Sequence, residues 1–422
     1  MQSPRKSSWS RGRVLVGFAV VASCGALAGW YFWDRTHTTI SLDGLRQASA
    51  AGNWSRVRTG GHGYLRRNPN DAEALVLVAR GEAADQRFEI SRELLARVPG
   101  DSPWSAEARL REGQVCRQLH LGPEAERAFR RAIEQGLATG GRQRTVDSAR
   151  LGLVQLFATE VRYPEAREMI WELYRTSPRP VAVLELLGRL DVEGTDPHEA
   201  IAVLEKFIAN VANDLEARRG LAHHYLNLGR ARDGLPLVEQ CVASRPDWLS
   251  AWETLLGCLA DLGDFKSLNE TISRLPAAAN ETAWCWHFRG FAAEQAGNLA
   301  AAEAAYRQAL QLDPFDSRLQ FRLGRVIYQL GADLAASEEH TARAQELAAT
   351  RATMREFYRQ LLLANQERSG PTSDLCYDMG SHYEALGLKS GAAAWYREVL
   401  KRDPANAKSR EKLARLENVD SQ

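Results

Sequence analysis

Residues 286–314 read WHFRGFAAEQAGNLAAAEAAYRQALQLDP, and this stretch decides the fold. Its two halves are joined at Gly297, and each half has the length and the apolar spacing of a short helix. Proline cannot continue the hydrogen-bond ladder of a helix, so Pro314 ends the second half. Large and small residues recur at positions where two paired helices would touch, namely Trp286, Gly290, Ala302, Tyr306 and Ala309.

The same pattern returns with a period of 34 residues. Gly229, Gly263, Gly297 and Gly331 are spaced by 34 residues and fall at the turn between the two helices of a unit. Internal periods of this length are typical of repeat proteins that stack helix pairs. The pattern predicts units that begin near residues 38, 72, 106, 147, 181, 215, 249, 283, 317 and 373.

Two spacings break the period. Extra residues fall in the segment GLATGGRQR at 136–144. A longer gap before the last unit leaves room for an extra helix near 351–367, followed by a break at Gly370-Pro371. After the last unit, the polar residues 405–418 are predicted to form a helix that caps the stack.

The residues of the 286–314 stretch resemble the tetratricopeptide repeat (TPR) family in type and offset, with departures at Arg289 and Ala293. The resemblance covers nearly everything after residue 37. It implies an all-α fold, in which residues 38–422 form a right-handed superhelical α-solenoid of about ten helix-turn-helix repeats. A single repeat cannot bury its apolar face, so stacked neighbours must do so.

The composition excludes several classes of protein. Hydrophobic residues make up 45% and charged residues 25%, close to the values of an ordinary globular chain. The 54 Lys and Arg residues nearly cancel the 53 Asp and Glu residues, and the net charge of +1 argues against a strongly basic nucleic-acid binder.

The N-terminus is predicted to be a membrane anchor. Residues 14–33 carry no charge, and twenty helical residues span about 30 Å, the thickness of the hydrocarbon core of a bilayer. Basic residues in the segment 1–13 predict that this segment stays in the cytoplasm. The repeats are then expected on the other side, in the periplasm of a bacterium. A cleaved signal peptide and a lipoprotein signal modified at Cys24 are the alternatives.

No motif in the sequence points to chemistry. The chain has no CxxC pair, no HExxH, no GxSxG and no phosphate-binding glycine loop. His223 and His224 are adjacent, so on a helix they point about 100° apart and cannot jointly hold one metal ion. We therefore expect no catalytic residues, no metal and no cofactor.

In the TPR family, positions 2, 5, 9, 12 and 13 of the first helix of each repeat line a concave groove. The resemblance assigns to this groove a set of aromatic, basic and polar residues. They are Arg219, His223, Asn227, Trp284, His287, Phe291, Arg318, Phe321, Arg325 and Tyr328. Aromatic and Arg side chains dominate binding hot spots, and the arginines could pair with carboxylates of a bound segment. The chaperone-binding carboxylate clamp of the family is not expected, since Arg219 and His223 stand where it would use Lys and Asn.

The sequence thus predicts a membrane-tethered scaffold without enzymatic activity, which binds protein or peptide segments in its groove. An adaptor for envelope biogenesis or secretion, related to lipopolysaccharide or exopolysaccharide, is the alternative. An enzyme with a degenerate site is the least favoured reading, because the repeats leave no room for a catalytic domain.

Overall fold

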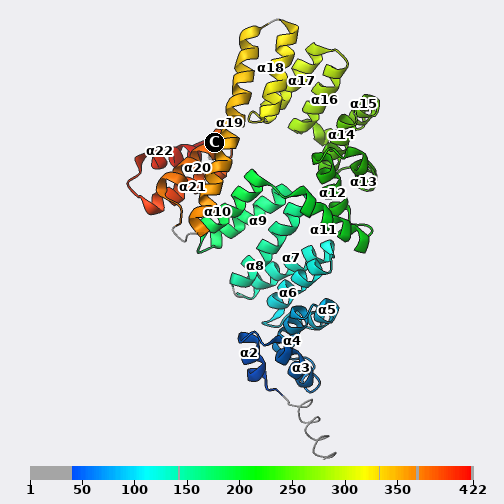
Figure 1. Ribbon diagram of the computed structural model, residues 1–422, viewed down its shortest axis with the longest axis vertical. Coiled ribbons are helices and arrows are strands. Elements are labelled where there is room, and N and C mark those ends of the chain that lie inside the picture. Colours follow the sequence, from blue (N-terminus) through cyan, green and yellow to red (C-terminus); the bar gives the residue numbers. More distant parts are fainter. Residues whose placement is uncertain (1–39, 141–142, 332, 367–369, 420–422) are drawn as a thin grey trace, which may run out of the picture. The chain divides into compact units, whose positions relative to one another are not determined.

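The computed structural model describes residues 40–140, 143–331, 333–366 and 370–419, and within these ranges all regular structure is helical (Figure 1). The α-helices up to the middle of the chain are α2 (Leu42–Ala50), α3 (Trp54–Leu65), α4 (Ala72–Ala84), α5 (Phe88–Ala96), α6 (Ser105–Gln118), α7 (Gly122–Ala138), α8 (Gln143–Thr159), α9 (Tyr163–Thr176), α10 (Pro180–Gly188) and α11 (Pro197–Asn210). Those that follow are α12 (Leu215–Asn227), α13 (Ala231–Ser244), α14 (Leu249–Asp261), α15 (Phe265–Ser273), α16 (Ala283–Gln295), α17 (Leu299–Leu312), α18 (Ser317–Leu330), α19 (Leu334–Gln366), α20 (Ser373–Ala385), α21 (Lys389–Arg402) and α22 (Ala407–Val419). A short π-helix, Arg189–Glu193, extends α10, and a 3₁₀ turn, Ala277–Glu281, precedes α16.

Within each unit, consecutive helices pack on one another, for example α3 on α4, α12 on α13, α16 on α17 and α18 on α19, as in an α-solenoid. The four glycines of the 34-residue register lie at the turns inside these pairs, with φ between 65° and 74°. This left-handed conformation costs glycine nothing, whereas other residues adopt it only with strain. The turn geometry therefore explains why glycine recurs at this place.

Close contact between the two helices of a pair follows a second spacing. A Cβ atom added to Gly113, Gly290 or Gly380 would lie 2.6–2.7 Å from the ring of an aromatic residue sixteen positions later. These aromatic residues are Phe129, Tyr306 and Tyr396, and all three are buried. The ring thus occupies the space that the missing side chain leaves free.

The chain divides into two compact units. The first contains the described residues 40–119, 127–140 and 143–146, and its core is an apolar cluster that includes Leu45, Val57 and Leu75. The second contains residues 120–126 and the described chain from 147 onward. The candidate groove residues all belong to the second unit.

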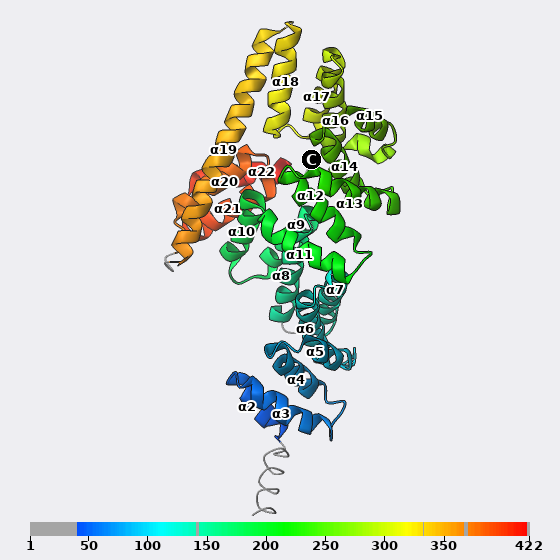
Figure 2. The ribbon, with the colours of Figure 1, turned by 45° about the vertical axis from the view of Figure 1, so that its right-hand side comes forward.

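The extra helix expected at 351–367 is not a separate helix. Residues 334–366 form one continuous helix, α19, of 33 residues (Figure 2). This segment contains no proline or glycine, so nothing ends the helix where a repeat would normally turn. Its first half pairs with α18, and its second half packs against α10 and α20.

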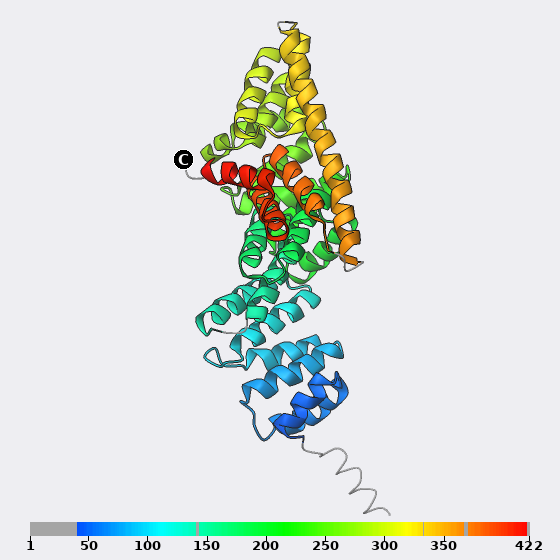
Figure 3. The ribbon, with the colours of Figure 1, turned by 90° about the vertical axis from the view of Figure 1, so that its left-hand side faces the viewer.

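The last repeat contacts a repeat far earlier in the chain. Helices α20 and α21 lie beside α10 (Figures 1 and 3). They share an apolar cluster with α9 and α10 that includes Leu184, Tyr358, Tyr383 and Trp395. The hydroxyl of Tyr174 on α9 donates to the carbonyl of Ala394 on α21 at 3.4 Å. The repeats from α9 to α21 therefore return on themselves, which the sequence did not lead us to expect.

The predicted cytoplasmic segment 1–13 and transmembrane helix 14–33 lie outside the described residues. Among the helices that the structure describes, none combines the length and the apolar character needed to cross a bilayer. The membrane anchor thus remains a prediction from the sequence.

Two glycines on neighbouring first helices provide a test of the packing. A Cβ on Gly220 would meet the backbone of Glu160 at 3.0 Å, whereas a Cβ on Gly257 would meet chiefly the end of the flexible Leu226 side chain. We expect Gly220→Ala to lower the free energy of unfolding by about 1–3 kcal/mol, because backbone cannot move aside. Gly257→Ala, the matched control, should change it by less than about 1 kcal/mol. Urea denaturation measures both, and equal losses would contradict the packing assigned here.

Candidate functional site

A groove runs across four consecutive first helices. Helices α12, α14, α16 and α18, with the turn before α18, line a cavity of about 710 Å³, here called the central groove. Its walls include His223 and Asn227 from α12, Glu253 and Asp261 from α14, Trp284, His287 and Phe291 from α16, and Asp316, Arg318 and Arg322 at the start of α18. No single repeat could form this surface, because each contributes only one strip of it.

A second cavity adjoins the central groove. It measures about 540 Å³, lies between α18 and α19, and shares His287, Arg318 and Arg322 with the groove. Phe321 and Arg325 complete its α18 wall. Phe321 is 51% exposed, so part of its side chain is open to solvent in this cavity.

The structure brings most of the predicted groove residues together. His223, Asn227, Trp284, His287, Phe291 and Arg318 line the central groove, and Phe321 and Arg325 line the adjoining cavity. Two predicted residues line neither space: Arg219 is buried, and Tyr328 is 66% exposed on α18.

Arg219 has a structural role. Its guanidinium donates to the carbonyl oxygens of Glu160 at 2.5 Å and of Val161 at 3.0 Å, and its side chain is almost fully buried. These carbonyls lie where the turn between α8 and α9 has no helical partner for them. Arg219 thus ties α12 to the preceding repeats and is not available to a bound segment.

Arg325 also joins repeats. It pairs with Glu294 on α16, whose carboxylate additionally accepts a hydrogen bond from the hydroxyl of Tyr306 at 2.8 Å. The same arrangement recurs in the last repeat, where Glu384 accepts from Tyr396 at 2.8 Å and pairs with Arg415. Both arginines stand 31 positions after their glutamate, so this contact belongs to the repeat architecture.

The two other arginines of the groove are engaged as well. Arg322 lies 3.4 Å from the Glu294 carboxylate, and its guanidinium stacks over the Phe291 ring at 4.8 Å. Arg318 is largely exposed and pairs with the neighbouring Asp316 at 3.3 Å. The expectation that groove arginines face a partner's carboxylates therefore rests on Arg318 alone, and even Arg318 has an internal partner.

The two histidines of the groove are neutral at physiological pH. Burial in the groove wall lowers the pKa of His223 to about 4, and the nearby charge of Arg219 adds to the effect. Burial likewise lowers the pKa of His287 to about 4, with smaller contributions from Arg322 and Arg318. The histidines hence add no positive charge to the groove near pH 7.

Sequence reasoning missed the acidic side of the groove. Glu253 and Asp261 lie on α14, and no hydrogen bond or ion pair to either carboxylate is found among the described residues. The surrounding protein raises the pKa of Glu253 above its usual value because it displaces water, while Arg219 and Arg318 oppose this change. The same position rule, applied to the repeat that begins at 249, points to both residues, so the signal was present in the sequence.

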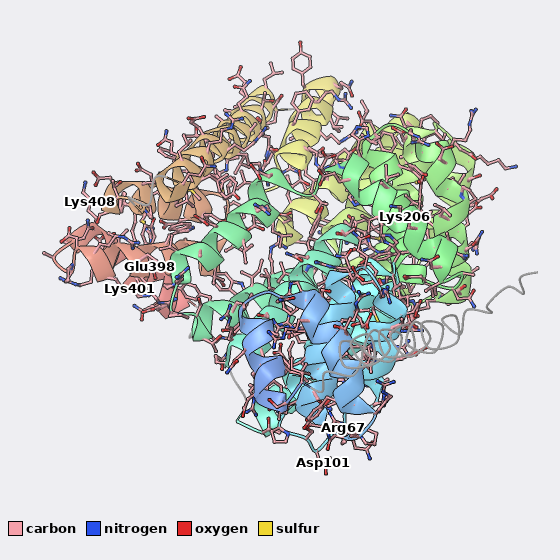
Figure 4. All side chains as sticks on the ribbon, turned by 60° about the horizontal axis from the view of Figure 1, so that its bottom comes forward. Arg67, Asp101, Lys206, Glu398, Lys401 and Lys408 are labelled. Carbon is pink, nitrogen blue, oxygen red and sulfur yellow. The ribbon has the colours of Figure 1, made fainter. Side chains whose placement is uncertain are left out.

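A larger cavity of about 940 Å³ lies apart from the groove, between the α9–α10 turn and α21. Its wall includes residues 370–371, next to the segment 367–369 outside the described ranges. Glu398 and Lys401 on α21, labelled in Figure 4, form an ion pair at 2.5 Å, and Arg402 approaches the same carboxylate at 3.3 Å. We regard this cavity as less suited to binding, because its buried carboxylate is already neutralised by two cations.

The described residues contain no cluster of three or more His, Cys, Asp or Glu side chains that could hold a metal ion. Five cysteines are buried, at positions 116, 241, 258, 285 and 376. Burial raises the pKa of the Cys241 thiol to about 11, which keeps it in the unreactive protonated form at neutral pH.

Comparison with known protein families identifies two of the repeats. Residues 283–316 and 373–406 match family models described as tetratricopeptide repeat. These two segments are tetratricopeptide repeats. The two matches cover α16–α17 and α20–α21, which are the pairs with the glycine–tyrosine contact and the Tyr–Glu–Arg arrangement. No curated protein sequence matches this chain.

Solved structures of TPR proteins show only distant likeness. MamA from Desulfovibrio magneticus RS-1 is 20% identical over 40% of this chain and 96% of its own, with a TM-score of 0.32. A chain of the APC/C hetero-tetramer Cut9–Hcn1 is 14% identical over 96% of this chain and 95% of its own, with a TM-score of 0.31. A tetratricopeptide repeat protein from Parabacteroides merdae ATCC 43184 is 15% identical over 64% of this chain and 98% of its own, with a TM-score of 0.31. Likeness at this level says nothing about what the chain binds.

The lowered histidine pKa values predict how stability depends on pH. Both groups bind a proton more weakly in the folded state than in the unfolded state, where the pKa is about 6.5. The stability that these two histidines contribute is therefore fully present above pH 6.5 and is lost as the pH falls toward 4. When the pH falls from 7 to 5, we expect each histidine to lower the free energy of unfolding by about 1 kcal/mol, after allowance for its partial exposure.

The variant His223→Gln/His287→Gln should lose less stability than the natural chain over this pH range. Urea denaturation at pH 7 and pH 5 measures the difference, with His198→Gln as the control, since this histidine lies on α11 outside the groove. Parallel loss of stability in the natural chain and the double variant would show that the groove does not hold these histidines neutral.

Proposed function

We propose that this chain is a scaffold that binds extended segments of partner proteins in the central groove. TPR repeats are protein-interaction modules, and the observation that supports this site is the continuity of the groove across α12, α14, α16 and α18. Aromatic rings of Trp284, Phe291 and Phe321 lie along the groove and its adjoining cavity. Rigid aromatic side chains in a hollow are typical anchors for a bound peptide.

We further propose that residues 14–33 tether this scaffold to a membrane and that the repeats face the periplasm of a bacterium. The uncharged run and the basic residues before it support this proposal. A tether would hold the groove close to the membrane surface and raise the effective concentration of partners in the same membrane.

A fractionation experiment tests the tether. The full chain should remain with the membrane pellet after sodium carbonate extraction, and a variant that lacks residues 2–33 should be released. Protease added to spheroplasts should digest the repeats of the full chain. Release of the full chain by carbonate would refute the tether, and survival of the repeats until lysis would refute the periplasmic side.

A truncation on α18 tests the groove. Peptides of twelve random residues displayed on phage are selected on the full chain in a non-ionic detergent, and the affinities of the enriched peptides are measured. We expect Phe321→Ala to weaken binding about thirtyfold, as loss of a hot-spot anchor does, because Phe321 is an exposed ring in the adjoining cavity. The melting temperature should stay unchanged, since little of this ring packs in the core.

The matched control is Tyr328→Ala, which removes an exposed ring from the same helix but from neither cavity. It should leave binding within about twofold. If no peptide is enriched, or if both variants bind equally well, the central groove is not the binding site.

A further inference from the structure

The cations of the central groove have partners within the protein, whereas two of its carboxylates do not among the described residues. Arg318 pairs with Asp316 and Arg322 pairs with Glu294, so both cations of the lining have internal partners. The carboxylates of Glu253 and Asp261 have none among the described residues. Since the two histidines are neutral, the charge that remains for a ligand is negative.

The two carboxylates share one face of α14. They stand eight positions apart, which places them about 12 Å apart along the helix axis. Gly257 lies midway between them on the same face, and the end of the Leu226 side chain occupies the space where its Cβ would project. An extended segment advances about 13 Å over four residues, so basic residues at i and i+4 could reach both carboxylates.

The ring of Trp284, in the same groove, differs from other tryptophan rings of the chain in its contacts with arginine. Arg274 and Arg289 lie over the rings of Trp252 and Trp286 at 5.9 Å and 4.6 Å. No cation lies over the ring of Trp284 among the described residues, although this half-buried side chain lines the groove. A tryptophan face attracts Lys and Arg, and the attraction is stronger where water is excluded.

We propose that the central groove selects basic segments, in which Lys or Arg side chains are held by Glu253, Asp261 and the face of Trp284. This proposal rests on the proposed function, because it names the chemistry of the partner for the same groove. It reverses the expectation from the sequence, in which groove arginines would hold an acidic partner. The reversal follows from the internal partners of Arg219, Arg318 and Arg325.

Both Glu253 and Asp261 are exposed, and the groove around Glu253 adds to the effect of its carboxylate. The walls of the groove exclude part of the water around Glu253, so a cation that arrives there meets less screening than on an open surface. A bound ammonium or guanidinium group would also replace the hydration that Glu253 has lost. A carboxylate of an acidic partner would instead meet two like charges, which is unfavourable.

The phage-selected peptides test this proposal directly. Peptides enriched on the natural chain should contain more Lys and Arg than Asp and Glu. The variant Glu253→Gln/Asp261→Asn should bind the same peptides at least tenfold more weakly at 150 mM NaCl. The matched control is Glu239→Gln/Glu270→Gln, which removes two exposed carboxylates from α13 and α15 outside both cavities and changes the net charge equally.

The control should bind within about twofold of the natural chain, since distant surface charges are screened beyond about 8–10 Å in this salt. Enrichment of neutral or acidic peptides would overturn the proposal, and so would equal binding by the two double variants. If the enriched peptides are acidic but still depend on Phe321, the groove binds segments and only its charge preference is wrong. If binding does not depend on Phe321, the proposed function fails and this inference fails with it.

Discussion

The contact between a first-helix glycine and an aromatic ring sixteen residues later is the constraint on which the rest of this structure depends. At Gly290 and Gly380 the ring of Tyr306 or Tyr396 fills the place where a Cβ would be, so the two helices of a repeat approach closely. The hydroxyl of the same tyrosine reaches a glutamate, Glu294 in the first case, which binds cations of the next helix. One residue thus sets the spacing within a repeat and the connection between repeats.

This constraint explains which parts of the fold the sequence could predict. Glycine, aromatic and proline positions are local requirements of a helix pair, and they recur with the period of the pair, so the repeats and their turns can be located from sequence alone. The continuous helix α19 and the contact of Tyr174 with α21 depend on other information. Both arise from how a non-repeating segment packs against distant residues, and no local pattern encodes that choice.

The candidate site, like the fold, could be predicted from the sequence only in part. His223, Trp284 and Phe291, which the family positions assigned to a groove, line one cavity in the structure, and their role in binding stays a prediction. The family positions did not indicate whether a charged side chain there is free, because Arg219 and Arg325 find partners in other repeats that a single repeat's pattern does not contain. The balance of used and unused charge therefore becomes visible only when the repeats are stacked.

The account's central claim is that a partner segment lies along the first helices α12, α14, α16 and α18. The most direct test gives an enriched peptide a photo-reactive benzoylphenylalanine and identifies the residues of the full chain to which it crosslinks. The account predicts crosslinks to groove residues between His223 and Arg322, and their loss when unlabelled peptide is added in excess. Competable crosslinks confined to the second helices α13, α15 and α17, or to the last repeat, would contradict it.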